Sequence, residues 1–310
     1  MSYLHYSGNL FNYELKFDGL LNLIFDDSST GKSTFANELS QNSNLIKTNA
    51  YSVIINPNLA VLQLLAKSID YEYIVVIDME RYDNSDEIDF ISKLRTTHIT
   101  FLILGRRYAA RLPVAIQNTY KFEICNGVTR NVRLIENNEF YNINPVKTII
   151  TEDSKSGYLF FKNIFKNVKS AGSNSNITRS LDINSVVIFD GLGFGAYLEK
   201  FLDAIEKEPR YSYICWHSFE YFILENVFNE FSIPRELNLE DAVTNKLREL
   251  KPDYSKTIGC TGDACRACSN SCKQSSKVCL KNSKYAKLLE LYEGQGQDSS
   301  FSHAINKMKQ

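Results

Sequence analysis

The chain alternates between two hydrophobic patterns, one typical of buried strands and one typical of helices. Continuous apolar runs that end in polar residues are typical of strands in a parallel sheet covered on both faces. Such runs are found at residues 20–25, 73–80, 99–104, 146–153, 186–191 and 211–216. Apolar residues at helical spacing predict helices at 35–40, 57–65, 86–94, 159–168 and 197–205. Strands that alternate with helices predict an α/β fold built on doubly wound parallel sheets.

Changes in this pattern predict three domains. The first α/β pattern covers residues 1–140 and begins with alternating apolar positions at 1–18, which predict a strand or hairpin. The second covers residues 141–235 and follows a polar linker at Asn142–Pro145. Residues 236–310 predict a helical, cysteine-rich module. Shorter elements are predicted as strands at 51–55, 120–125 and 128–135, and as a polar loop at 170–178.

The sequence Gly31–Lys32–Ser33–Thr34 lies between the first apolar run and the helix that follows it. This is the strand–loop–helix order of a phosphate-binding loop, in which backbone N–H groups and a helix N-terminus face an anion. In such a loop Lys32 would reach the β- and γ-phosphates, and the Ser33 hydroxyl would bind Mg²⁺. Asp26 stands where the pattern G-x-x-x-x-G-K-[ST] has its first glycine.

We therefore predict that the loop binds ATP with Mg²⁺. The residues predicted to bind the nucleotide are Ser29, Thr30, Gly31, Lys32, Ser33 and Thr34. The alternative is a chance Gly-Lys-Ser-Thr sequence at the start of a helix.

With these motifs, the first region resembles a compact P-loop NTPase of the ATPase type. The resemblance implies that Asp78, near the end of an apolar run, is the Walker B aspartate that holds the water shell of Mg²⁺. It also implies that Glu80 polarises the attacking water and that Arg106 senses the γ-phosphate. Alternatively, Arg106 and Arg107 cap the strand end or pair with surface acids. ATPases of this type often build their site between subunits, so the resemblance also implies a homo-oligomer in which an arginine acts in trans.

The second region carries Glu152 and Asp190 at the ends of two apolar runs, and Glu220 at the start of a later helix. Carboxylates at the carboxyl ends of parallel strands converge at one edge of a sheet, where they can hold Mg²⁺ for work on a phosphodiester. This order resembles a Toprim domain, although Leu192 replaces the second aspartate of the family's Asp-x-Asp pair. Asp153, Glu220 or Glu225 could supply the missing ligand. Alternatively, these acids are ordinary strand-end and N-cap residues.

An ATPase domain followed by a Toprim domain is the order found in the overcoming-lysogenisation-defect family of nucleases. The resemblance implies nucleotide-dependent nucleic-acid processing, in which Glu152, Asp190 and Glu220 support Mg²⁺-dependent phosphodiester cleavage gated by ATP binding or hydrolysis. The alternative is a non-catalytic nucleotide-binding switch, with a degenerate ATPase site and acids that serve structure alone.

Five of the seven cysteines lie between residues 260 and 279, a spacing that argues for a metal site in a reducing compartment. The five are Cys260, Cys265, Cys268, Cys272 and Cys279. Four thiolates in a tetrahedron favour Zn²⁺, with an iron–sulfur cluster or a disulfide as alternatives. Lysines and arginines around the cysteines form a basic segment that could bind the phosphate backbone of nucleic acid, or simply be solvated. The remaining two, Cys125 and Cys215, are predicted to be core residues.

The net charge of the chain bears on the kinds of molecule that it could attract. Lys and Arg number 35 and Asp and Glu number 36, so the net charge of −1 gives no overall attraction to nucleic acid or to an anionic membrane. No apolar run reaches the roughly 18 residues of a membrane-spanning helix, and no signal peptide is apparent. We therefore expect a cytoplasmic protein without a membrane partner.

Overall fold

The computed structural model describes residues 1–246 except 26–29, 80–84, 95, 106–111, 136–147, 155, 156, 159, 160, 163, 164, 193, 220, 222–242, 244 and 245. The chain divides into two compact units, of which the first consists mainly of Met1–Glu136 and the second begins at Asn137. Both units are α/β. Among the described residues, no helix is both long enough and apolar enough to span a membrane.

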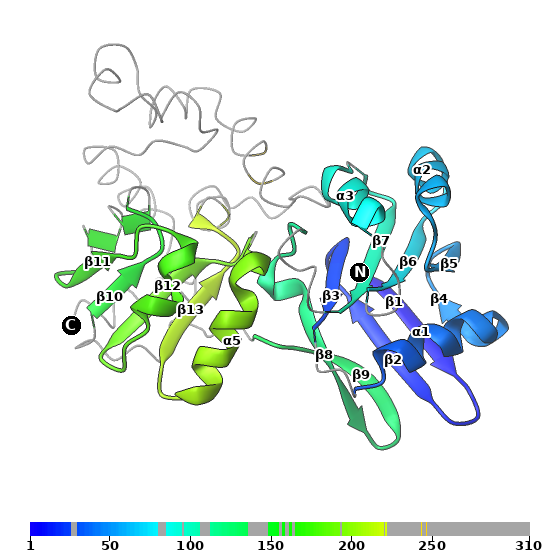
Figure 1. The fold of residues 1–310 in the computed structure, drawn as a ribbon, viewed down its shortest axis with the longest axis horizontal. Coiled ribbons are helices and arrows are strands. Elements are labelled where there is room, and N and C mark those ends of the chain that lie inside the picture. The colour runs from blue at the N-terminus through cyan, green and yellow to red at the C-terminus, as the bar shows by residue number, and fades with distance from the viewer. Residues whose placement is uncertain are drawn as a thin grey trace, which may run out of the picture. The chain divides into compact units, whose positions relative to one another are not determined.

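The first unit contains a sheet of nine described strands in the order β4-β1-β2-β9-β8-β3-β7-β6-β5 (Figure 1). In chain order these strands are β1 (Ser2–Ser7), β2 (Asn12–Phe17), β3 (Leu21–Ile24), β4 (Ile46–Thr48), β5 (Ser52–Ile55), β6 (Tyr73–Asp78), β7 (Ile99–Leu104), β8 (Thr119–Cys125) and β9 (Val128–Arg133). The helices described in this unit are α1 (Lys32–Gln41), α2 (Leu59–Lys67) and α3 (Ser85–Lys93), with the short 3₁₀ helices η1 (Ser43–Leu45) and η3 (Ile116–Asn118).

This sheet is mixed, which corrects the prediction of a parallel sheet for the first region. The central strands β5, β6, β7, β3 and β8 do pair in parallel. However, β1 is antiparallel to β2 and β4, and β8 is antiparallel to β9. The turns from β1 to β2 and from β8 to β9 are too short for a parallel crossover, which needs about a dozen residues. The second turn is Asn126–Gly127, and both residues have the positive φ of a tight hairpin turn.

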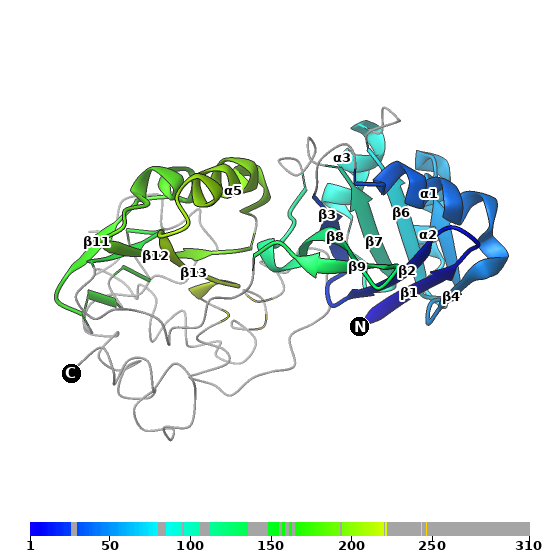
Figure 2. The ribbon, with the colours of Figure 1, turned by 90° about the horizontal axis from the view of Figure 1, so that it is seen from below.

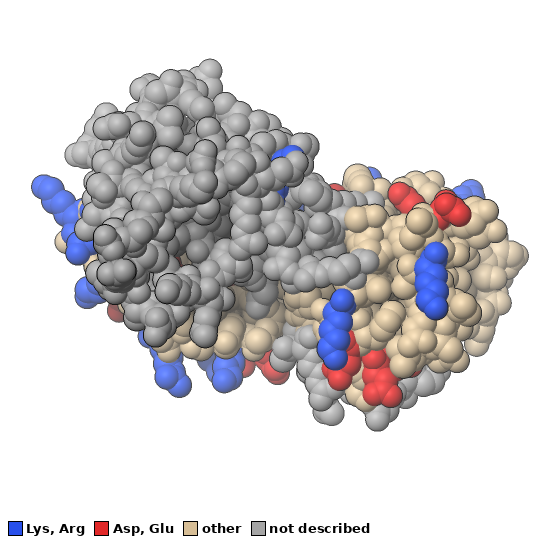
Figure 3. Space-filling view, turned by 90° about the horizontal axis from the view of Figure 1, so that it is seen from above, with Lys and Arg blue, Asp and Glu red and all other residues tan. Residues whose placement is uncertain are grey.

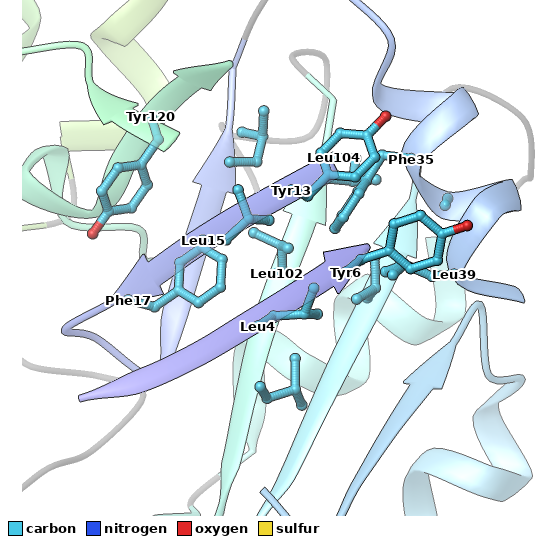
Figure 4. Packing of buried hydrophobic residues seen from close by; sticks show 14 residues of the cluster. Leu4, Tyr6, Tyr13, Leu15, Phe17, Phe35, Leu39, Leu102, Leu104 and Tyr120 are labelled. Atoms are coloured by element: carbon cyan, nitrogen blue, oxygen red, sulfur yellow. The ribbon is translucent and has the colours of Figure 1, made fainter. Parts of the chain in front are cut away.

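A single hydrophobic cluster joins the β1–β2 hairpin, α1 and one face of the parallel strands (Figure 4). Leu4 and Leu15 of the hairpin lie beside Leu102 of β7, while Phe35 and Leu39 come from α1. Each of these side chains is at most 1% exposed. Full burial of one such side chain contributes roughly 1.5–3 kcal/mol. The cluster therefore fixes α1 against the strand that precedes it.

The topological switch point of this sheet lies between β3 and β7. From β3 the chain passes through α1 towards β5, whereas α2 and α3 carry it back in the opposite direction to β6 and β7. Right-handed crossovers that run in opposite directions cover opposite faces of a sheet. Ile24, Leu104 and Asp78 pair in register, so the carboxyl ends of β3, β7 and β6 are level. Ligands of open α/β sheets bind outside this edge, at the switch point.

The second unit has a sheet of four described strands, all parallel, in the order β11-β10-β12-β13. The strands are β10 (Thr148–Thr151), β11 (Val168–Ser170), β12 (Ser185–Asp190) and β13 (Ser212–Trp216). Between the last two lies α5 (Leu198–Lys207), most of which belongs to this unit, and its 3₁₀ helices are η5 (Asn174–Asn176) and η6 (Thr178–Ser180). The 3₁₀ helix η7 (Phe194–Tyr197) is grouped with the first unit. α5 lies along one face of the sheet (Figure 2), where Phe201 packs edge-on against Phe189 and Tyr213.

Four local predictions were wrong or missing. Val168 begins a strand instead of ending a helix, and Ser170 belongs to that strand instead of a polar loop. The three-residue strand β4 gave no apolar signal, because its residues are half-buried or exposed. Cys125 is exposed at the tip of the β8–β9 hairpin, whereas Cys215 is buried as predicted. The pairing of β8 with β3 stops at Tyr120, so the end of β8 extends beyond the core.

Candidate functional site

A glycine with a left-handed backbone directly precedes the first residue of α1. Gly31 has φ +84° and ψ 11°, in the left-handed region that favours glycine, and a Cβ at this position would meet nothing within 4 Å. Its carbonyl accepts the first helical hydrogen bond, from Phe35 N at 2.8 Å. Gly31, the N-cap residue, has no side chain with which to cap the helix. The backbone conformation, not the available space, therefore requires glycine here.

Lys32 and Asp78 are buried charged residues at the same edge of the first sheet. Lys32, the first residue of α1, is 2% exposed, and Asp78, the last residue of β6, is 1% exposed. Lysine and aspartate are almost never buried to this degree without compensating partners, because removing a charge from water is costly. The Lys32 Nζ donates to Thr30 Oγ1 at 3.4 Å, a long contact that holds the ammonium towards the loop. Ser33 and Thr34, which follow Lys32, are half-buried.

Asn56 also belongs to this edge, although the sequence patterns did not single it out. It follows β5 directly, and its Oδ1 accepts a hydrogen bond from the backbone N–H of Asp78 at 2.7 Å. The sequence feature that could have indicated Asn56 is its position between an apolar run and a proline. Asparagine at such a position is typical of a tight turn, since it tolerates a left-handed backbone.

In the second unit, Glu152 and Asp190 come together at the carboxyl edge of the sheet. The backbone N–H of Asp190 donates to Glu152 Oε2 at 3.1 Å. The Nε1 of Trp216, at the end of the neighbouring strand β13, donates to Asp190 Oδ1 at 2.7 Å. The pairing of Asp190 with Trp216 in the parallel register brings these groups together. Trp216 was not singled out from the sequence, because its contact depends on strand pairing.

Cys215 lies within the field of both carboxylates. Burial raises the pKa of the Cys215 thiol well above its usual value, and the charges of Asp190 and Glu152 raise this pKa further. The two carboxylates that act on this thiol belong to the same edge of the sheet, where a hydrogen bond links the two residues. A cation placed there would relieve the repulsion.

Asp153 has a structural role in the turn that follows it. Its Oδ2 accepts from Gly157 N at 3.1 Å and its Oδ1 from Tyr158 N at 2.9 Å, so the carboxylate caps the helical turn that follows. Leu192, at the position of the family's second aspartate, is 6% exposed and belongs to the core. Ser218 caps the next helix start, where its Oγ accepts from Tyr221 N at 3.0 Å.

Several predicted site residues lie outside the described part of the chain. They are Ser29, Glu80, Arg106, Glu220, Glu225, Cys260, Cys265, Cys268, Cys272 and Cys279. Within the described residues, no group of three or more His, Cys, Asp or Glu side chains is placed to hold a metal ion. The roles of these residues and the zinc site stay predictions.

Side chains of both charge signs lie on the face of the first unit that Figure 3 shows. On the visible face of the first unit, Lys and Arg side chains lie among Asp and Glu side chains (Figure 3). Some are paired across strands, as Arg130 is with Glu14 at 2.9 Å and Arg133 with Asp18 at 2.8 Å. Comparison of the sequence with protein-family models and with curated proteins gave no match. The functional argument therefore depends on the two sheet edges.

Proposed function

We propose that the first unit binds a nucleoside triphosphate with Mg²⁺ at the edge formed by β3, α1 and β6. The observation that carries this proposal is the burial of two charged residues at one edge of the sheet. Lys32 begins the helix that follows β3, Asp78 ends β6, and the carboxyl ends of β3, β7 and β6 are level. Lys32 would neutralise the β- and γ-phosphates, and the N–H groups at the start of α1 would donate to their oxygens. The Ser33 hydroxyl and Asp78 supply oxygen donors of the kind that Mg²⁺ prefers. The metal would neutralise phosphate charge.

Equilibrium binding of ATP to the purified protein tests this proposal. We expect saturable binding of one ATP per chain that is stronger in Mg²⁺ than in EDTA and is competed by inorganic triphosphate. Competition by triphosphate would locate the interaction at the phosphates. Absence of saturable binding would contradict the proposal.

We propose further that the second unit uses Glu152 and Asp190 to bind a divalent cation for phosphodiester cleavage. The supporting observation is the hydrogen bond that links the two residues at the end of parallel strands, with Trp216 orienting the aspartate. Carboxylate oxygens suit Mg²⁺ or Mn²⁺. Such an ion would activate water and stabilise charge on the phosphate. The alternative of a switch with acids of purely structural importance predicts no cleavage of plasmid, single-stranded DNA or RNA.

Trp216 provides a direct test of cation binding because it is the one tryptophan in the sequence. We expect Mn²⁺ to quench the fluorescence of Trp216 saturably, since the indole is hydrogen-bonded to Asp190. Asp190→Asn keeps an oxygen that can accept from the indole but removes the charge, so it should weaken Mn²⁺ binding at least about tenfold. Equal quenching curves for Asp190→Asn and wild type would contradict the site.

A further inference from the structure

Asn56 adopts an unusual backbone conformation beside the proposed nucleotide site. Its φ is +48°, and the described residues include one other non-glycine residue with positive φ, Asn126 in the β8–β9 turn, at +53°. Asparagine tolerates this region better than most residues but still pays a conformational cost that glycine does not. The position of Asn126 is explained by its hairpin turn. The position of Asn56 needs another explanation.

The side chain of Asn56 replaces a missing hydrogen bond of the sheet. β5 and β6 pair in parallel with Ile55 opposite Val76, and Asn56 N continues this ladder by donating to Val76 O at 2.8 Å. If β5 continued, the next bond would run from Asp78 N to the main-chain carbonyl of residue 56. The left-handed turn at Asn56 redirects that carbonyl, and Asn56 Oδ1 accepts from Asp78 N at 2.7 Å instead.

The turn that contains Asn56 is anchored by both helices that follow. Asn58 caps α2, because its Oδ1 accepts from Val61 N at 3.0 Å. Leu59 N, at the start of α2, donates to Glu87 Oε1 of α3 at 3.0 Å. These contacts hold the corner after β5 at a fixed place, so the Asn56 side chain meets the end of β6 from a rigid support.

We propose that Asn56 is a positioning residue for Asp78. By accepting the N–H of Asp78, it fixes the backbone of the last residue of β6 and so directs the carboxylate towards the Mg²⁺ of the bound triphosphate. Asn56 itself does not touch the nucleotide. The inference rests on the proposed nucleotide site. It says that the increase in nucleotide affinity caused by Mg²⁺ depends on the hydrogen bond between Asn56 and Asp78, which lies outside the phosphate loop.

The test compares ATP affinity in Mg²⁺ and in EDTA for wild type, Asn56→Gly and Asn126→Gly. Asn56→Gly suits the left-handed backbone and removes the acceptor of the Asp78 N–H. We expect Asn56→Gly to leave the ATP affinity in EDTA unchanged. The increase in ATP affinity on adding Mg²⁺ should be about fivefold to tenfold smaller than in wild type, which is the effect of losing one hydrogen bond. Asn126→Gly makes the same chemical change at a similar φ, far from Asp78 in the sheet order, and should change neither affinity.

A double-mutant cycle shows whether the effect passes through Asp78. In an Asp78→Asn background, adding Asn56→Gly should cause no further decrease in the Mg²⁺-dependent increase of ATP affinity. The inference is overturned if Asn56→Gly shows the same increase in ATP affinity with Mg²⁺ as wild type, or if it weakens ATP binding equally in EDTA and in Mg²⁺. It is also overturned if Asn126→Gly has the same effect as Asn56→Gly, or if Asn56→Gly still lowers the Mg²⁺-dependent affinity in the Asp78→Asn background. If wild type binds no ATP, both the nucleotide site and this inference fail. If wild type binds and Asn56→Gly behaves as wild type, the inference alone fails.

Discussion

Lys32→Met is expected to lower the affinity for ATP at least about a hundredfold, the loss anticipated when two or more charge-assisted hydrogen bonds to phosphate are removed. Methionine keeps most of the aliphatic length of the side chain, so the packing around the buried Lys32 should survive. The ammonium is the feature that the substitution removes. Equilibrium titration with ATP in Mg²⁺ measures the effect, and Lys32→Ala should show the same loss.

Lys67→Met is the matched control for this experiment. Lys67 is exposed in the last turn of α2, so the same chemical change occurs away from the carboxyl edge of the sheet. We expect wild-type affinity for Lys67→Met and melting temperatures for both variants close to that of wild type. If Lys32→Met binds ATP within about threefold of wild type, the loss is smaller than that of one ordinary hydrogen bond. That result would contradict the assignment of a phosphate loop.

Glu152→Gln is expected to reduce Mg²⁺-dependent cleavage of nucleic acid at least about a hundredfold, because a correctly held metal supplies several kcal/mol of charge stabilisation in the transition state. Glutamine keeps the size of the side chain and an oxygen that can accept from Asp190 N. The substitution therefore removes the charge more than the local structure. Cleavage of plasmid, single-stranded DNA and RNA in Mg²⁺ or Mn²⁺ provides the measurement.

Asp153→Asn is the control at the neighbouring position. Asp153 caps a helical turn through both carboxylate oxygens, and asparagine keeps one of these two acceptors. The control removes one negative charge beside Glu152 and should keep most of the cleavage activity. If both variants cleave as wild type does, or if Asp153→Asn loses as much as Glu152→Gln, the assignment of Glu152 to the metal is wrong.

The sequence predicted most strands of both sheets, although not β4 or β11, and the acids at the ends of β6 and β12. The apolar runs that end at Asp78 and Asp190 are long and uninterrupted, and such runs specify buried parallel strands. Gly31 and Lys32 were singled out because the phosphate-loop pattern depends on local order along the chain. In each case the information lies within a few neighbouring residues.

The contacts that organise the two edges could not be predicted in the same way. The bond from Trp216 to Asp190 joins residues 26 positions apart, and the bond from Asp78 to Asn56 spans 22 positions. Both depend on which strands are neighbours and on their register, and local patterns do not encode this pairing. For the same reason the antiparallel additions β1, β2, β4 and β9 were not recognised as parts of one mixed sheet.

The rate of nucleic-acid cleavage with and without ATP tests the expectation that connects the two proposed sites: the resemblance described above implies that ATP bound by the first unit gates cleavage by the second. The account predicts that wild type in Mg²⁺ cleaves faster when ATP is added, and that Lys32→Met does not respond to ATP at any concentration. Cleavage by wild type at the same rate with and without ATP, under conditions where ATP is bound, would contradict this coupling.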